Sequence, residues 1–390
     1  MTCISRRRFL HTGALALGSG LIPASAISAF AGQGKKSDIS GTIFTDAAPD
    51  SLWKWSQEAY FYQQMPGGKV ACTLCPNSCV LDKGDRSVCR SRVNMDGKLY
   101  SLAYGNPCAL HLDPVEKKPL FHFRPRSRAL SIATTGCNLR CLNCQNWQIS
   151  QVTPESVRHQ ELFPKAVIDK ARANQADAVA YTYSEPTTFF EYMMDTAKLA
   201  KDNGLSNLWI SNGYINAEPL ARLCRVLDGA NVNLKSFSDK TYRKLNGGRL
   251  KPVLETFKTL HDKGVHFEMT TLVVPGYVDD PEMIKSMCGW ILENLGPDHP
   301  LHFLRFFPRY KLDRLPPTPV SRLTEFRELA MAEGIRYVYV GNVPDHEGSH
   351  TYCHNCGKRL IQRSGYHIPE YHLEGNRCKF CNTRIPGVWV

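Results

Sequence analysis

The chain has 390 residues, 43% hydrophobic and 22% charged, so it can bury a core and is long enough for two or three domains. Its 28 glycines and 24 prolines exclude a collagen-like or low-complexity chain. The formal net charge is +12, which favours anionic ligands such as nucleotides, phosphates or nucleic acid without selecting one of them. The 15 cysteines cluster at gaps of two and three residues, which disfavours a disulfide framework and indicates several metal centres on reduced thiolates.

Residues 1–31 have the pattern of a twin-arginine export signal. Arg6, Arg7 and Arg8 precede a weakly apolar stretch of small residues that contains two Ala-x-Ala sequences suited to cleavage. The pattern predicts export to the periplasm, and an unused signal would leave the chain in the cytoplasm; a basic start on an amphipathic helix is the alternative. No later stretch reaches the roughly 20 apolar residues of a membrane helix. Residues 32–50 are predicted to be a linker.

Residues 51–115 are predicted to form a small cysteine-rich domain, after which short β-rich runs alternate with helical patterns. The predicted strands cover residues 128–134, 178–183, 207–211, 231–235, 266–274 and 301–307. The predicted helices cover residues 164–176, 187–203, 218–227, 252–263, 281–295 and 321–333. Strands separated by single helices imply βαβ units and a parallel sheet. We therefore predict an α/β fold with a partial (β/α)6 TIM-like barrel over residues 116–345, with ligands at the C-terminal ends of the strands.

Cys137, Cys141 and Cys144 form a CxxxCxxC pattern directly after the first predicted barrel strand. Three thiolates can hold three irons of a 4Fe-4S cluster. The fourth iron then has no protein ligand, and an open metal position is typical of a catalytic centre rather than a structural one. Zinc with a distant fourth ligand is the alternative for the same cysteines.

With this pattern the chain resembles the radical SAM superfamily, which uses such a cluster to cleave S-adenosylmethionine into methionine and a 5'-deoxyadenosyl radical. Polar residues at successive strand ends extend the resemblance. It implies that Glu185 binds the methionyl amino group and that Ser211 and Asn212 contact the ribose. It also implies that Lys235 meets a carboxylate and that the backbone at Gly276 approaches the adenine. The alternative for Glu185 is that it only favours the start of the next helix.

In particular, the chain resembles the radical SAM enzyme of the AmmeMemoRadiSam system and, beyond it, the activating enzymes of glycyl-radical enzymes such as pyruvate formate-lyase. The matching stretches are residues 72–79, 113–123, 136–146 and 306–312. One departure is Asn143, at a position that is usually aromatic in the superfamily. The resemblance implies a flavodoxin or ferredoxin as electron donor. It implies hydrogen abstraction from a substrate that it does not identify, with a macromolecule or a partner glycyl-radical protein both open.

Two further groups of four cysteines flank the barrel. The first comprises Cys72, Cys75, Cys79 and Cys89. It can close a zinc site or hold a second iron–sulfur cluster, with disulfides as the alternative. The second comprises Cys353, Cys356, Cys378 and Cys381. Its paired CxxC knuckles predict a zinc ribbon in residues 346–390, where an excess of basic residues leaves weak nucleic-acid contact open.

The remaining cysteines do not share this spacing. Cys224 and Cys288 lie on apolar helix faces and are predicted to be core thiols, while Cys108 is either a small hydrophobe or a redox-active thiol. A second function also stays open: an exported electron carrier with several iron–sulfur centres and no S-adenosylmethionine chemistry. That function would explain the cysteines but would leave the polar residues at the strand ends without a role.

Overall fold

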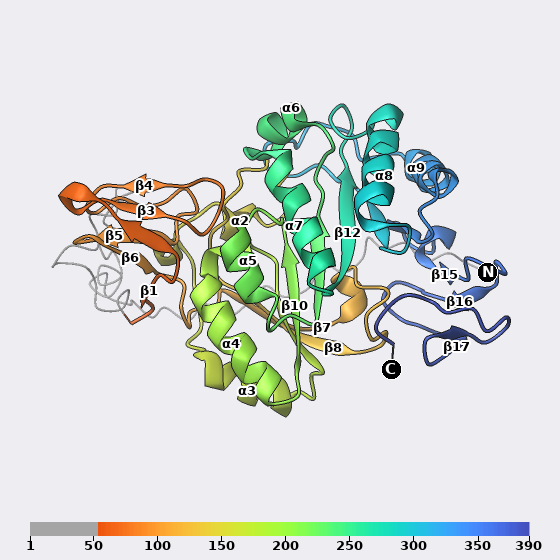
Figure 1. Ribbon diagram of the computed structural model, residues 1–390, viewed down its shortest axis with the longest axis horizontal. Coiled ribbons are helices and arrows are strands. Elements are labelled where there is room, and N and C mark those ends of the chain that lie inside the picture. Colours follow the sequence, from red (N-terminus) through yellow and green to blue (C-terminus); the bar gives the residue numbers. More distant parts are fainter. Residues whose placement is uncertain (1–53, 390) are drawn as a thin grey trace, which may run out of the picture. The chain divides into compact units, whose positions relative to one another are not determined.

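The structure is a computed structural model that describes residues 54–389 (Figure 1). The predicted export signal and linker lie outside the described residues. Within the part of the chain that is described, no helix combines the length and the apolar character needed to cross a membrane.

An eight-stranded sheet lies at the centre of the described residues, in the order β14-β13-β12-β11-β10-β9-β8-β7. The parallel strands are β8 (Arg128–Ala133), β9 (Ala178–Tyr181), β10 (Ser206–Ser211), β11 (Gly229–Asn233), β12 (His266–Val273), β13 (Leu301–Arg305) and β14 (Val338–Gly341). At one edge, β7 (Ala109–Pro114) runs antiparallel to β8. Among the described strands the two edges do not pair with each other, so the sheet stays open.

The six predicted strands are all present, but the sheet is two strands longer than the predicted barrel. One of the two additional strands is β14, a strand of four residues. β7 falls in the segment that the sequence assigned to the cysteine-rich domain. It joins the central sheet because its backbone pairs with β8 along six residues, from Ala109 opposite Ala133 to Pro114 opposite Arg128. Such pairing is a tertiary contact that composition does not reveal.

Helices cover the outer face of the sheet, and Figure 1 shows α4, α5, α7 and α8 in front of it. The main helices are α3 (Pro164–Ala173), α4 (Phe190–Asp202), α5 (Ala217–Leu223), α7 (Leu250–Asp262), α8 (Pro281–Leu295) and α9 (Val320–Glu333). The short ones are α2 (Trp147–Ser150), α6 (Asp239–Thr241), η2 (Pro66–Gly68), η3 (Val115–Lys117), η4 (Pro154–Ser156), η5 (Pro186–Phe189), η6 (Tyr242–Asn246) and η7 (Glu347–Ser349).

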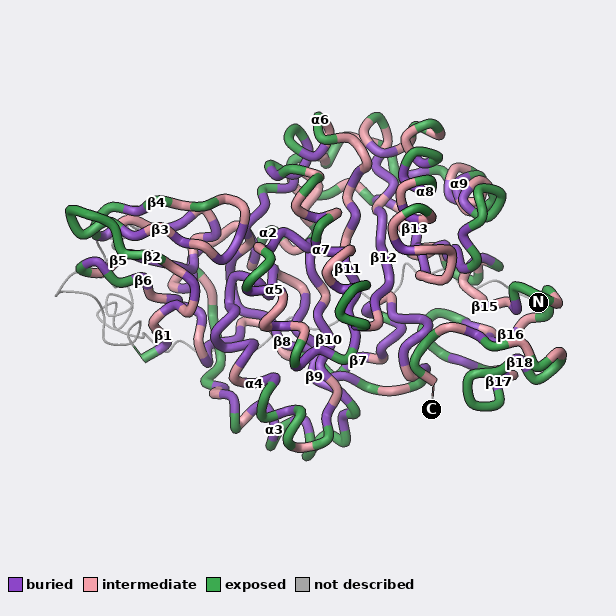
Figure 2. The backbone as a smooth tube through the Cα atoms, viewed as in Figure 1, coloured by how far each residue is buried: buried purple, intermediate pink, exposed green. Residues whose placement is uncertain are grey.

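Helix α8 shows why the sequence forms these elements. The Asp280 side chain accepts a hydrogen bond from the Glu282 N–H, and Pro281 occupies the first helical position, so the helix start is capped. Its buried residues, among them Ile284, Cys288 and Ile291, recur at helical spacing and face the core. Cys288 is fully buried and is a core thiol, as predicted. Figure 2 shows the buried strands behind helices whose outer turns are exposed.

The N-terminal cysteine-rich segment forms two small antiparallel sheets. One contains β1 (Gln57–Glu58), β6 (Lys98–Ser101) and β5 (Arg92–Met95), and the other contains β2 (Tyr62–Gln64), β3 (Val70–Cys72) and β4 (Val80–Leu81). The segment packs on α4, where Arg92 forms a buried, bidentate ion pair with Glu191. This pair joins the segment to the helical layer of the central fold.

The C-terminal segment forms two short hairpins, β15 (Thr351–Tyr352) with β16 (Arg359–Ile361) and β17 (Leu373–Glu374) with β18 (Arg377–Cys378). The buried Arg363 guanidinium joins this segment to the central fold by donating to the Phe121 carbonyl at 3.0 Å, and it also donates to the Thr351 hydroxyl within the segment at 2.8 Å. The Val388 N–H also donates to the His122 carbonyl at 2.8 Å. The segment thus closes on residues at the N-terminal side of β8.

Candidate functional site

The three central cysteines lie on the loop that follows β8, at the C-terminal end of that strand. The loop begins at Gly136, whose φ of 103° lies in the left-handed half of conformational space. A Cβ atom there would lie 2.6 Å from the carbonyl oxygen of Cys89. Only glycine therefore lets the loop leave the strand at this point and pass against the N-terminal cysteine-rich segment.

A π-helical turn, η6, holds the other side of the cysteine loop. The backbone N–H groups of Arg140 and Leu142 each donate at 2.8 Å to η6 carbonyls, those of Asn246 and Leu245. The Asn246 side-chain amide also donates to the Cys141 sulfur at 3.3 Å. Single π-helical turns occur frequently at functional sites. The sequence analysis missed Asn246, although the Asn-Gly-Gly run that it begins was a visible signal of an irregular helix end.

The central cysteines differ from a compact single-ion site. Two thiolates that bind one zinc at about 2.3 Å lie at most about 4.6 Å apart. Among residues 54–389, the C-terminal cysteines form the one compact group of three or more candidate ligands, with all atoms within 4.8 Å of one another. Cys137, Cys141 and Cys144 do not belong to such a group. Three thiols on one loop suit a cluster, in which each thiolate binds a different iron.

The surroundings of these thiols oppose their ionisation when no metal is bound. Burial, followed by the charge of Glu185, raises the pKa of Cys137 well above its usual value. Burial raises the pKa of Cys144 as well, against a lowering effect of the Lys235 charge. A metal that binds here therefore has to displace the thiol protons.

Glu185 is buried at the end of β9, where its carboxylate joins two strand ends. One oxygen accepts from the N–H and the hydroxyl of Thr187, at 3.0 and 2.7 Å, and from the Ser211 hydroxyl at 2.7 Å. The other accepts from the Asn212 N–H at 2.9 Å. The capping role that the sequence left open is thus present in the structure. A carboxylate has about four acceptor positions, so the second oxygen keeps capacity for an ammonium ligand.

Ser211 and Asn212 already have partners within the protein. The Ser211 hydroxyl donates to Glu185, and the Asn212 side-chain carbonyl accepts from the Tyr214 N–H at 2.8 Å. The Asn212 amide donates to the Asn138 side chain at 2.8 Å and lies 3.7 Å from the Cys137 sulfur. Both residues therefore lie beside the cysteine loop, and their side chains orient that loop. Whether they contact a ribose stays a prediction.

Lys235 and Gly276 lie at the ends of the next two strands. The half-buried Lys235 side chain makes no salt bridge with any described residue, and its charge acts on Cys144. Gly276 is exposed, has a φ of 73°, and has nothing within 4 Å of the position of a Cβ atom. Lys235 is thus a cation available to a ligand beside the cysteine loop, while Gly276 belongs to an open turn.

Several buried polar atoms at this end of the sheet have no hydrogen-bond partner. They are Thr135 Oγ1, Asn143 Oδ1, Ser184 Oγ and Asn246 Oδ1, all on the cysteine loop, on η6 or beside Glu185. A buried polar group left unpaired costs about 1–3 kcal/mol, so four in one place indicate that a polar ligand belongs there. The three thiols are suited to bind an iron–sulfur cluster. The Lys235 ammonium and these unpaired polar atoms are suited to bind S-adenosylmethionine beside it.

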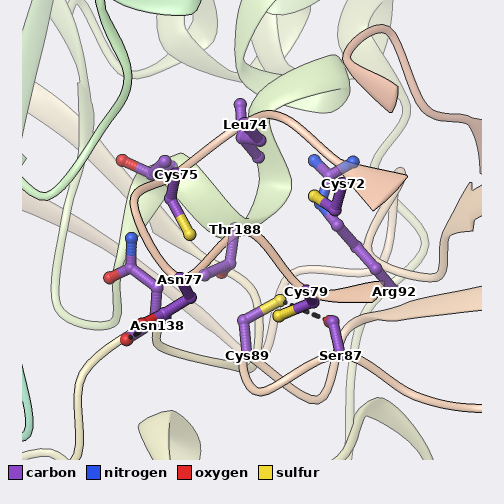
Figure 3. A pocket seen from close by; sticks show the side chains of 11 residues that line it. Cys72, Leu74, Cys75, Asn77, Cys79, Ser87, Cys89, Arg92, Asn138 and Thr188 are labelled. Carbon is purple, nitrogen blue, oxygen red and sulfur yellow. Dashed lines mark hydrogen bonds between the residues drawn. The ribbon is translucent and has the colours of Figure 1, made fainter. Parts of the chain in front are cut away.

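The upstream cysteines also converge. Cys72, Cys75, Cys79 and Cys89 line one cavity (Figure 3). All fourteen described cysteines are free, so the disulfide alternative finds no support among the described residues. Cys108 lies apart from every cysteine group; its N–H donates to the Ala133 carbonyl at 2.8 Å, and burial raises its pKa to about 11. That environment fits the small hydrophobe rather than a redox-active thiol.

The C-terminal cysteines form a compact tetrad. The sulfurs of Cys353 and Cys381 are 3.6 Å apart and those of Cys356 and Cys378 are 3.8 Å apart. Zinc–sulfur bonds of about 2.3 Å in a tetrahedron place neighbouring sulfurs about 3.8 Å apart. The tetrad therefore has the dimensions of a closed, single-ion site.

Cys224, which was predicted to be a core thiol, is only half-buried. It lies at the end of α5 and packs against the core.

Comparisons with known proteins agree with this geometry. Residues 131–288 match the radical SAM superfamily. An uncharacterised protein of Methanocaldococcus jannaschii is 44% identical over 331 residues, covering 84% of this chain and 98% of that protein. The pyruvate formate-lyase 1-activating enzyme of Escherichia coli is 27% identical over 203 residues, covering 47% of this chain and 80% of the enzyme.

Among solved structures, a radical SAM methyltransferase from Sphaerobacter thermophilus aligns with a TM-score of 0.45 at 12% identity, covering 77% of this chain and 82% of that protein. The assignment of the chain to this family rests on the sequence matches and on the cysteine loop. Membership of the superfamily implies S-adenosylmethionine and a 4Fe-4S cluster as cofactors. The chain belongs to the radical SAM superfamily and is an enzyme of the activating-enzyme-like kind.

Proposed function

We propose that this protein cleaves S-adenosylmethionine reductively on a 4Fe-4S cluster held by Cys137, Cys141 and Cys144. When bound, the cluster and S-adenosylmethionine supply a 5'-deoxyadenosyl radical that abstracts hydrogen from a substrate. The observation that carries the proposal is the loop after β8, where three thiols at the C-terminal end of the strand adjoin buried polar atoms without partners. The competing function, an electron carrier without S-adenosylmethionine chemistry, leaves those atoms and Lys235 unused.

The protein's own residues have separable tasks in this proposal. The Asn246 amide donates to the Cys141 sulfur, and the Leu139 N–H donates to the Cys137 sulfur at 3.4 Å. Hydrogen bonds to cluster sulfurs orient the ligands and tune the reduction potential. Lys235 would bind the methionyl carboxylate by a charge-assisted hydrogen bond. The free acceptor position on Glu185 would receive the methionyl ammonium.

Anaerobic reconstitution with iron and sulfide tests this function. The reconstituted protein, given S-adenosylmethionine and dithionite, should release 5'-deoxyadenosine. Protein that is shown to carry the cluster on the central loop, yet releases none in the presence of candidate substrates, would contradict the proposal.

The substrate class proposed here is a protein. Support comes from the likeness to an enzyme named for activating pyruvate formate-lyase, which extends over 80% of that enzyme. A flavodoxin or ferredoxin would supply the electron. Deuterium transfer checks the substrate: a candidate protein prepared with deuterated amino acids should pass deuterium into 5'-deoxyadenosine. Transfer from a nucleic acid or a small metabolite, with none from proteins, would contradict this choice.

Replacing Lys235 with methionine should weaken S-adenosylmethionine binding roughly tenfold or more. A hydrogen bond to a charged group contributes about 1.5–3 kcal/mol, and each 1.4 kcal/mol is a tenfold change in affinity. Equilibrium dialysis with the reconstituted protein measures the dissociation constant. Lys240→Met, at an exposed position on the neighbouring helix α6, is the matched control and should bind normally. Equal affinities for both variants would exclude the carboxylate contact.

We propose that the C-terminal tetrad binds one structural zinc ion. Cys356→Ser should lower the zinc content from about one per chain to near zero and lower the melting temperature, because structural zinc contributes folding energy directly. Metal analysis and a thermal scan measure the two effects. Cys224→Ser removes a thiol outside every cysteine group and should keep the zinc. An unchanged zinc content in Cys356→Ser would remove the tetrad from consideration.

A further inference from the structure

We propose that Cys72, Cys75, Cys79 and Cys89 hold a second 4Fe-4S cluster, closed by four protein thiolates, that relays single electrons to the central cluster. The relay rests on the function proposed above. The identity of the second centre does not, because it follows from the geometry of these four cysteines alone.

The four thiols reach one cavity from different parts of the N-terminal segment. Cys72 ends strand β3, and its N–H donates at 2.9 Å to the carbonyl of Cys79, which precedes β4. Cys75 closes the turn between them, since its carbonyl accepts from the Ser78 N–H at 3.1 Å. Cys89 comes from the loop before β5. Figure 3 shows the four cysteines around one space, which no carboxylate or histidine lines.

The C-terminal tetrad gives a reference for a single-ion site within the same chain. In that tetrad, two sulfur pairs lie 3.6 and 3.8 Å apart, as one tetrahedral ion requires. Among the described residues, the upstream cysteines do not form a second group of such closely spaced ligands. Four thiolates around a shared cavity are the arrangement of a 4Fe-4S cluster, whose irons each take one cysteine.

A buried cation without a full set of partners gives a second, independent sign of a ligand. Arg92 lines the cavity, is 1% exposed, and Figure 3 shows it beside Cys72. Its two terminal nitrogens pair with Glu191, but its Nε–H has no partner. A 4Fe-4S cluster with four thiolates is anionic in both redox states. The Arg92 charge and its unpaired N–H therefore fit an anionic group in this cavity.

Two serine hydroxyls lie within hydrogen-bonding distance of the Cys89 sulfur. The Cys89 sulfur lies 3.0 Å from the Ser87 hydroxyl and 3.4 Å from the Ser91 hydroxyl. Hydrogen bonds to cluster sulfurs and nearby positive charge set the reduction potential.

The cavity adjoins the central cysteine loop. Asn138, the residue after Cys137, lines the cavity, and its carbonyl accepts from the Asn77 side chain at 2.7 Å. On the other side of Cys137, Gly136 packs directly against the Cys89 carbonyl. Residues on both sides of Cys137 thus contact the upstream site, so the two cysteine groups are neighbours and an electron would pass between their clusters without a further carrier.

The surface turn at Cys79 gives the route of entry, because Ser78 and Val80 on either side of it are exposed. A reduced flavodoxin or ferredoxin would lose one electron there, and the second cluster would gain it. The second cluster would then be oxidised as the central cluster is reduced. No bond is formed or broken and no proton moves in either transfer.

Metal analysis of the full chain with Cys137, Cys141 and Cys144 all changed to alanine tests the identity of the second centre. After anaerobic reconstitution this variant should keep about four irons and four sulfides per chain, roughly half the wild-type content, and give a 4Fe-4S electron paramagnetic resonance signal with dithionite. A variant with normal circular dichroism that holds no iron and a second zinc would overturn the proposal. A cluster retained here, with no 5'-deoxyadenosine from the wild type, would refute only the proposed function.

The choice of reductant tests the relay. Cys79→Ala should form 5'-deoxyadenosine at least tenfold more slowly than the wild type when reduced flavodoxin or ferredoxin is the donor, and at a near-normal rate with dithionite, which can reach the central cluster directly. Cys108→Ala is the control cysteine and should be normal with both donors. Equal rates for Cys79→Ala and the wild type with the protein donor, or an equal loss with both reductants, would overturn the relay.

Discussion

Replacing Cys141 with alanine is expected to abolish the release of 5'-deoxyadenosine. The central loop supplies three thiols, and removing one leaves an iron without its protein ligand, so the cluster would be lost or would no longer offer a single open iron. Cys141 also receives the Asn246 hydrogen bond that ties the loop to η6. Chromatography of the nucleoside after anaerobic incubation with S-adenosylmethionine and dithionite measures the effect.

Cys224→Ala is the matched control for this variant. It removes one half-buried thiol that belongs to none of the cysteine groups, so its activity should stay near that of the wild type. Iron content and circular dichroism, measured on both proteins, separate a missing cluster from a failure to fold. Full activity in a folded Cys141→Ala protein would refute the catalytic role of the loop.

Replacing Arg92 with methionine is expected to lower the free energy of unfolding by about 3–5 kcal/mol, because breaking a buried ion pair leaves one charge uncompensated. Glu191 is fully buried, and its two carboxylate oxygens accept hydrogen bonds from the two terminal nitrogens of Arg92. The pair also joins the N-terminal segment to α4. Urea unfolding of metal-loaded protein measures the change, and iron content must be followed so that lost metal is not mistaken for lost pairing.

The double variant Arg92→Met/Glu191→Leu isolates the cause. It removes both charges and fills the space with apolar side chains, which is often neutral or stabilising, so most of the lost stability should return. An exposed pair gives the contrast: Lys165→Met breaks the surface pair with Asp169 and should have little effect. A single Arg92→Met variant as stable as the wild type would show that the pair does not hold the segment.

The local pattern determined the helices and strands of the central fold. Helix α8 has the predicted bounds at both ends, because Asp280 and Pro281 start it and Gly296 ends it. The helix predicted for residues 187–203 instead begins with the short η5 turn, since Glu185 accepts the Thr187 N–H and caps that turn. Caps and periodicity act over a few residues, so they can be found in the sequence.

The cysteine groups were also visible in the sequence, because ligands close in the chain are close in space. The sequence did not show which metal centre each group can bind. The C-terminal knuckles and the upstream cysteines have similar spacing at their first pair, yet one set forms a tetrad of single-ion size and the other surrounds a cavity. Arg92 lines the upstream cavity together with the four cysteines, and the Gly136 loop packs against the Cys89 carbonyl.

Only the tertiary structure shows which of these side chains already have hydrogen-bond partners within the protein and which do not. Glu185 and Ser211 lie 26 positions apart and bind each other, while Asn246 reaches Cys141 across 105 positions. β7 belongs to the central sheet because it pairs with β8, although the predicted boundaries placed its residues in the cysteine-rich domain. The sequence by itself determined the types of ligand and their local order. The fold decided their partners, because hydrogen bonds, ion pairs and strand pairing join residues that are distant along the chain.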